Sequence, residues 1–214
     1  MGLLSSLISL FSCNGQTNKN QPTFDETFEI FQTLDYRLNH GVEKSDVSYS
    51  YAELSEFGLP PLSMTYQILG LTIEREPWTP ITNKCWTFDL EAIEDHGAYI
   101  DIMENISRIT NGDLIFKDLK DYVDIEAGKA WVSFTCNRDT YKWDLKVDND
   151  WADGDLFDRV QDLAKKYNTQ RKFTYFNTGG QDFVLGYSTP DELDKIRKAT
   201  GLNIVILKAK GQIY

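Results

Sequence analysis

The sequence predicts an α+β protein: a mainly antiparallel sheet with helices packed on one face, and a helical segment at the N-terminus. Two observations support this prediction. Several stretches repeat apolar residues at helical spacing, and alternating stretches occur in pairs that short polar turns connect. Hairpins of this kind are antiparallel, and helices then cover the apolar side of the sheet. No repeat or linker divides the chain after residue 24, so we expect a single α+β domain over residues 24–214.

Helices are predicted where apolar side chains recur every three or four residues. The first has Phe24, Phe28 and Phe31 on one face. The last begins at Ser188-Thr189-Pro190-Asp191-Glu192, which offers a cap candidate, a proline near the first turn, and acids that suit the positive end of a helix dipole. Asp153 is a candidate N-cap for a helix that runs through Tyr167. The predicted helices cover residues 24–39, 48–57, 62–69, 98–109, 153–167 and 189–200.

Strands are predicted where apolar and polar side chains alternate between turn residues. The clearest hairpin joins residues 129–136 to residues 140–147 through Asn137-Arg138-Asp139. A second pair, residues 171–177 and 182–187, is joined by a turn with two glycines. Shorter strands are expected at residues 84–90 and 114–116, and an apolar final strand at residues 202–208.

The chain is acidic, with 33 aspartates and glutamates against 22 lysines and arginines and a formal net charge of −11. Nucleic-acid binding depends on basic side chains that neutralise phosphates, so this excess argues against a nucleic-acid partner. It also disfavours an anionic membrane surface. No run approaches the roughly 18 apolar residues of a membrane-spanning helix, so no membrane span is expected.

The negative charge is concentrated in the middle of the chain. Residues 89–126 carry a formal charge of −8 and residues 139–163 carry −5, whereas residues 164–214 carry +5. We call residues 89–163 the acidic block. An acidic block of this kind can be a solubilising surface, or it can steer a basic partner to the protein and accelerate their association.

The N-terminal 23 residues have two interpretations. Leu10-Phe11-Ser12-Cys13 resembles a bacterial lipoprotein signal, and the polar tract that follows resembles its tether. The positively charged start of such a signal is missing, because the first basic residue is Lys19. The alternative is an amphipathic helix with Leu3, Leu7 and Phe11 on one face. We expect a cytoplasmic protein, with a lipid anchor at Cys13 as the alternative.

Sequence motifs for catalysis, metal binding and cofactor binding are absent. The run Asp148-Asn-Asp-Trp-Ala-Asp-Gly-Asp155 resembles a calcium loop, but Ala152 falls at a ligand position and Arg159 falls where a bidentate glutamate belongs. An EF-hand is therefore rejected, and an irregular divalent-cation site is left as an alternative. Cys13, Cys85 and Cys136 are too widely spaced for a metal or redox motif. We expect no cofactor and no metal.

Two groups of residues remain as candidate sites. Glu94, Asp95 and His96 could supply acid and base groups to a hydrolase-like enzyme, or could mark the loop before the helix at 98–109. Among the tryptophans, Trp78 and Trp151 fall in predicted loops. They could be surface anchors, since tryptophan is enriched in binding hot spots, although we favour core packing for both.

The segments Cys85-Trp-Thr-Phe-Asp-Leu-Glu91, Asp148-Asn-Asp-Trp151 and Gly180-Gln-Asp182 resemble those of uncharacterised bacterial α+β proteins. The size, the acidity and the missing catalytic motifs resemble immunity proteins of bacterial toxin systems. This resemblance implies a non-enzymatic protein that neutralises a basic toxin domain. The alternatives are a hydrolase-like enzyme and a surface lipoprotein. The contact residues we expect are Asp148, Asp150, Trp151, Asp153 and Asp155, followed by Glu94 and Asp95.

Overall fold

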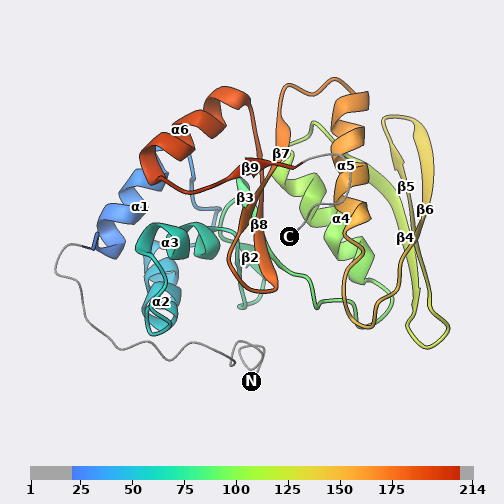
Figure 1. Ribbon diagram of the computed structural model, residues 1–214, viewed down its shortest axis with the longest axis horizontal. Helices are drawn as coiled ribbons and strands as arrows, with labels where there is room; N and C mark the ends of the chain where they lie inside the picture. The colour runs from blue at the N-terminus through green and yellow to red at the C-terminus, as the bar shows by residue number, and fades with distance from the viewer. Residues whose placement is uncertain (1–20, 208–214) are drawn as a thin grey trace.

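The computed structural model describes residues 21–207 (Figure 1). Most of the N-terminal segment, including Cys13, therefore lies outside the described residues, as does the end of the predicted final strand. None of the helices within residues 21–207 has the length and apolar character needed to cross a membrane.

Antiparallel sheets and separate helices make up the fold, which confirms the predicted α+β class. The central sheet has four strands in the order β3 (Cys85–Asp89), β8 (Asp182–Ser188), β7 (Lys172–Asn177) and β9 (Val205–Ile206). All neighbouring strands in it are antiparallel. A small two-stranded hairpin, β1 (Thr72–Ile73) and β2 (Thr79–Pro80), lies between α3 and β3 in the sequence.

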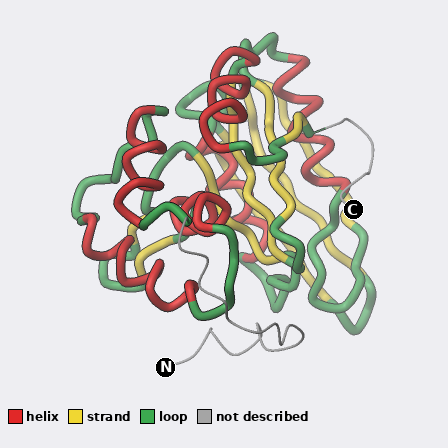
Figure 2. The backbone as a smooth tube through the Cα atoms, turned by 60° about the vertical axis from the view of Figure 1, so that its left-hand side comes forward, coloured by secondary structure: helices red, strands yellow, loops and turns green. Residues whose placement is uncertain are grey.

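The central sheet has helices on both faces (Figures 1 and 2). One face packs against α3 (Pro61–Leu69) and α6 (Pro190–Thr200), and α1 (Phe24–Thr33) and α2 (Lys44–Ser55) pack against α3. The other face packs against α4 (Ala98–Ile109) and α5 (Asp155–Lys166). Alternation along β8 explains the two cores, because Val184 contributes to the first and Leu185 to the second.

A second sheet covers the far side of α4 and α5. It has three antiparallel strands, β4 (Phe116–Asp124), β5 (Lys129–Cys136) and β6 (Asp139–Leu145). Val132 and Phe134 of β5 point into the second core, and the opposite face of the sheet has no helix over it in Figure 1. The prediction of helices on one face describes this outer sheet, whereas the central sheet lies between two helical layers.

Capping interactions explain where several helices begin. Thr189 and Glu192 form a capping box at the start of α6, and Gly201 ends that helix in a left-handed conformation. The N-cap of α4 is Gly97, which has no side chain to accept a hydrogen bond, and the carboxylate of Asp121 on β4 takes over that role. It accepts hydrogen bonds from the backbone N–H of Gly97 at 2.8 Å and of Tyr99 at 3.1 Å.

Several predicted boundaries are wrong. The first helix ends at Thr33 rather than at residue 39, because Asp35 adopts a positive φ of 65° that a helix does not allow. The short strand expected at residues 114–116 is the start of the nine-residue β4. The apolar final strand shrinks to Val205 and Ile206, and both are exposed rather than buried in a core.

Two tryptophans also differ from expectation. Trp78 is 57% exposed in the loop between β1 and β2, and Trp151 is 39% exposed in the loop before α5. Core packing is therefore the wrong assignment for both. Trp78 follows Pro77, and Trp151 follows the turn that begins at Asp148. Neither lies in a strand with alternating apolar residues, which would direct its side chain into the core.

Candidate functional site

Two loops from the acidic block meet at one end of the molecule. Residues 90–97 precede α4, residues 146–154 precede α5, and Figure 1 shows both helices beginning at its lower end. Backbone hydrogen bonds join the loops: Ala152 N donates to Leu90 O at 2.8 Å, and Ile93 N donates to Asp150 O at 2.9 Å. Ile93 and Ala152 are buried at this junction. The acids that flank these residues therefore belong to one surface.

Most of the predicted contact residues are exposed on these two loops. Asp150 and Trp151 lie at a tight turn in which Trp151 N donates to Asp148 O at 3.1 Å and Asn149 has a positive φ of 50°. The Lys146 Nζ is 3.0 Å from Asp148 Oδ2. We define the acidic surface by its exposed members, which are Glu91, Glu94, Asp95, Asp148, Asp150, Trp151 and Asp155.

Asp153 differs from the other predicted contact residues because its carboxylate faces inward. The residue is 8% exposed, and its oxygens accept hydrogen bonds from the backbone N–H of Lys146 at 2.8 Å and of Asp155 at 3.0 Å. Its own N–H donates to the Tyr99 hydroxyl at 3.2 Å. The N-cap position itself belongs to Gly154. We therefore assign Asp153 a structural role, as the group that fixes the loop before α5.

Glu94, Asp95 and His96 lack the surroundings of an acid–base site. Glu94 and Asp95 are exposed, and Asp95 Oδ1 is 2.9 Å from His96 Nδ1. The same Nδ1 is 3.4 Å from Val123 N, and the imidazole lies 4.9 Å from the Tyr122 ring. These contacts attach the loop to β4. Catalytic acids and bases usually lie in a cleft that separates them from bulk water. Glu94, Asp95 and His96 are instead exposed on a surface loop.

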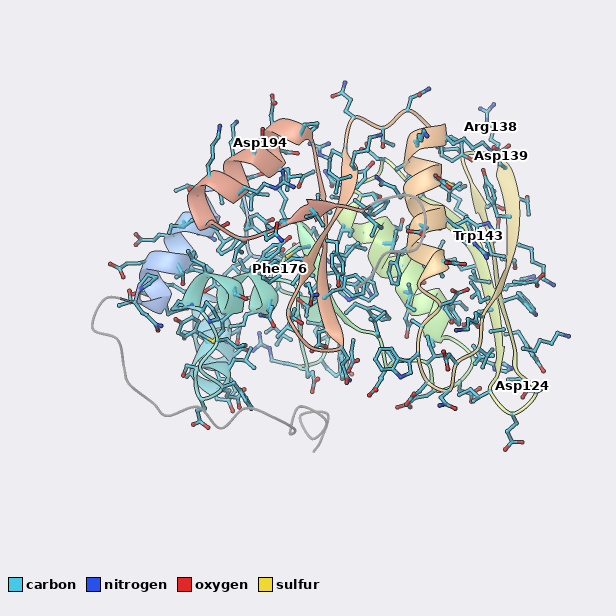
Figure 3. All side chains as sticks on the ribbon, in the orientation of Figure 1. Asp124, Arg138, Asp139, Trp143, Phe176 and Asp194 are labelled. Atoms are coloured by element: carbon cyan, nitrogen blue, oxygen red, sulfur yellow. The ribbon has the colours of Figure 1, made fainter. Side chains whose placement is uncertain are left out.

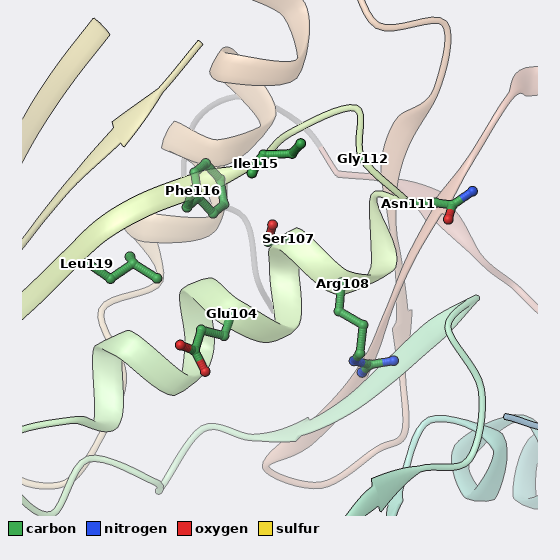
Figure 4. Close-up of a pocket in the computed structure, with 8 residues that line it drawn as sticks. All are labelled: Glu104, Ser107, Arg108, Asn111, Gly112, Ile115, Phe116 and Leu119. Carbon is green, nitrogen blue, oxygen red and sulfur yellow. The ribbon is translucent and has the colours of Figure 1, made fainter. Parts of the chain in front are cut away.

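A hollow of about 460 Å³ lies between α4 and the start of β4, away from the acidic surface (Figure 4). In Figure 4 the Arg108 side chain points away from Phe116 and Leu119. Its guanidinium donates to Asn105 Oδ1 within α4 and to Thr82 O in the loop before β3. The bond to Thr82 joins α4 to that loop. Burial lowers the pKa of Arg108 from its ordinary value. None of the predicted site residues lines this hollow.

A polar network joins the β5–β6 turn to the end of α5, near Asp139 in Figure 3. The Lys166 Nζ donates to Asp139 Oδ2 and to Tyr141 Oη, each at 2.7 Å, and Tyr141 Oη is 2.6 Å from Tyr167 Oη. The contact with Asp139 raises the pKa of Lys166 to about 12, and the contact with Lys166 lowers the pKa of Asp139. Neither group exchanges protons near neutral pH, so the network is structural.

One pair of carboxylates next to the acidic surface was not predicted. Asp89 and Asp182 are direct cross-strand partners in β3 and β8. Burial, together with the charge of Asp89, raises the pKa of Asp182 to about 6. The Gln181 amide donates to both carboxylate oxygens of Asp89, at 2.9 and 3.1 Å. Only the strand register brings these residues together, and no pattern in the sequence gives that register.

Within residues 21–207, no group of three or more histidine, cysteine, aspartate or glutamate side chains is arranged to hold a metal ion. Cys85 and Cys136 are free and buried, and burial raises the pKa of the Cys85 thiol to about 12. Comparisons of the chain with protein-family models, curated proteins and solved structures find no match.

Proposed function

We propose that the protein is a non-enzymatic binding protein whose acidic surface captures a basic partner. The observation that carries this proposal is the backbone junction between the loops at 90–97 and 146–154. Six exposed carboxylates lie on these loops and at the start of α5, together with the half-exposed indole of Trp151, although the joined residues are more than fifty positions apart in the sequence. Complementary charge around an aromatic anchor favours fast and specific protein association.

The partner class we propose is the basic domain of a toxin, which this protein would neutralise as an immunity-type protein. The carboxylates would pair with lysines and arginines of the partner, and Trp151 would fill a depression between them. The free, buried thiols of Cys85 and Cys136 agree with a reducing cytoplasm, which is the location we propose. Mass spectrometry of the native N-terminus tests this location, because a diacylated Cys13 would show the lipoprotein alternative instead.

Charge reversal tests the proposed surface. D148K/D150K changes two carboxylates of the acidic surface, and E53K/E56K makes the same change in net charge at the end of α2. Wild-type protein is used to capture partners from its native cells, and the affinity of each variant for the captured basic protein is measured. We expect D148K/D150K to weaken binding about a hundredfold or more and W151A about tenfold, with E53K/E56K close to wild type.

Two results would contradict the proposal. One is that no basic protein is captured, and the other is that both double variants bind as the wild type does. The toxin assignment has a test of its own. The captured partner, expressed alone, should arrest growth, and co-expression with the wild-type protein should restore growth more fully than co-expression with D148K/D150K.

A further inference from the structure

The outer face of the three-stranded sheet carries the opposite charge from the rest of the acidic block. Register places Lys117, Lys120 and Lys129 on this face, and Lys142 of β6 joins them. Val132 and Phe134 of β5 are buried against α4 and α5. The lysines share the opposite face with Trp131 and Ser133, which alternate with these buried residues. Figure 1 shows no element covering that side of the sheet.

A row of rings crosses this face at its centre. The Tyr122 and Trp131 rings are direct cross-strand neighbours, 6.3 Å apart and nearly parallel at 9°. His96 lies against Tyr122, and the Lys142 Nζ lies 4.2 Å from the Trp131 ring centre. The ring faces are thus occupied by neighbours within the protein, which leaves ring edges for a ligand. Ring edges carry the positive part of the aromatic quadrupole and favour anions.

The four lysines are available for an external partner. None of them forms an ion pair with another residue in the described part of the chain, whereas Lys44, Lys84 and Lys166 each do. Lys120 and Lys142 flank Ser133 in one cross-strand row, so their Cα atoms are about 10 Å apart. An oxyanion above Ser133 could therefore reach both ammonium groups.

Acids on or beside the face do not cancel its charge. Asp124 is the cross-strand partner of Lys129, and it accepts hydrogen bonds from Ala127 N at 2.8 Å and from Tyr122 Oη at 3.2 Å. Asp144 is the cross-strand partner of Trp131. Asp118 is exposed in the bulge between Lys117 and Lys120. Four lysines against these three aspartates still leave an excess of positive charge, in a protein whose net charge is −11.

We propose that this lysine face, defined by Lys117, Lys120, Lys129 and Lys142, binds an acidic segment of a protein. Spaced carboxylates fit the spaced ammonium groups and the ring edges. A single-stranded nucleic acid fits less well, because its bases stack on open ring faces, and here those faces are covered. Its continuous phosphate charge is also repelled by the remainder of the molecule. The lysine face is separate from the acidic surface and does not depend on the function proposed there.

An oligoglutamate peptide of about eight residues, the length of β5, is a suitable probe. It is titrated into the full-length protein at low salt, and binding is followed through the chemical shifts of the Trp131 indole and the Ser133 amide. K120E/K142E removes the central lysines, and K195E/K198E makes the same change in net charge on α6. Circular dichroism confirms that both variants are folded.

We expect saturable binding that perturbs Trp131 and Ser133. K120E/K142E should weaken it about tenfold or more, and K195E/K198E less than about threefold. Equal weakening by both variants would show attraction by net charge alone and would overturn the proposal, as would a lack of saturation. Tighter binding of an oligothymidylate with the same number of charges would also overturn it, by showing a polyphosphate site instead.

Discussion

Carboxylates of the acidic block have two roles that composition alone does not separate. Asp121 and Asp153 accept backbone hydrogen bonds at the starts of α4 and α5, where the free N–H groups of a helix favour negative charge. Asp148 and Asp150 project to solvent. Part of the acidity therefore stabilises the two helices that carry the acidic surface, and only the remaining carboxylates are available to a partner.

Asp182 makes the stability of the protein depend on pH. Its pKa is raised to about 6 in the folded protein, while in the unfolded chain a carboxyl of this type titrates near 3.9. The folded protein therefore binds the proton more tightly, so this stabilisation is complete below about pH 4 and is lost as the pH rises past about 6. We expect D182N to raise the free energy of unfolding by about 1 kcal/mol at pH 7, allowing for solvent screening, and to have little effect at pH 4.

Urea unfolding at pH 4, 5, 6 and 7 measures this difference. D162N, which changes an exposed carboxylate on α5, is the control and should match the wild type at each pH. An effect of D182N that is the same at every pH would show that it arises from packing rather than from the titration of Asp182.

At the scale of elements, what could be predicted depends on the local pattern. Helix α4 and strand β5 have the predicted bounds, because each repeats a single period between clear turn residues. Strand β4 was missed over most of its length. Its alternation breaks at Asp118, where a positive φ of 53° and a register shift mark a bulge, and its outward residues are mostly charged. Its pairing with β5 depends on contacts between residues that are distant in the sequence, and a local pattern of apolar and polar residues does not predict such contacts.

Helix α3 approaches β3 so closely that only glycine fits at its end. Thr87 N donates to Gly70 O at 2.9 Å, and a Cβ added to Gly70 would lie 2.5 Å from Thr87 N. We expect G70A to lower the free energy of unfolding by about 1–3 kcal/mol, because neither backbone segment can move away freely. The control is G180A, since a Cβ there meets open space. Chemical denaturation of both variants should show the difference, and equal stabilities would contradict the close approach.

At the scale of the whole molecule, the central sheet separates two cores and contributes side chains to both, so we expect them to unfold together. Ile68 lies in the first core, whereas Trp86 lies in the second. The meeting of the two acidic loops follows from this arrangement, since α4 and α5 start at the same end of the layer between the sheets. The sequence indicated both acidic loops but not their contact, because that contact depends on how the layers stack.

A mutation in one core should therefore be detected in the other. We expect I68A to lower the free energy of unfolding by about 2–5 kcal/mol, and tryptophan fluorescence and far-UV circular dichroism to report the same shifted midpoint. I115A changes a half-exposed side chain and should shift neither midpoint by more than about 0.5 kcal/mol. Separate midpoints for the two signals in I68A would show that the cores unfold independently.

His96 lies at the border between the acidic surface and the lysine face, since it contacts Asp95 on one side and Tyr122 on the other. If both surfaces bind the partners proposed for them, the two binding events are thermodynamically linked. A basic partner on the first surface reduces the net negative charge that an acidic partner meets at the second. Reciprocity then requires the acidic partner to strengthen capture of the basic one by the same factor, so a ternary complex would assemble with positive cooperativity.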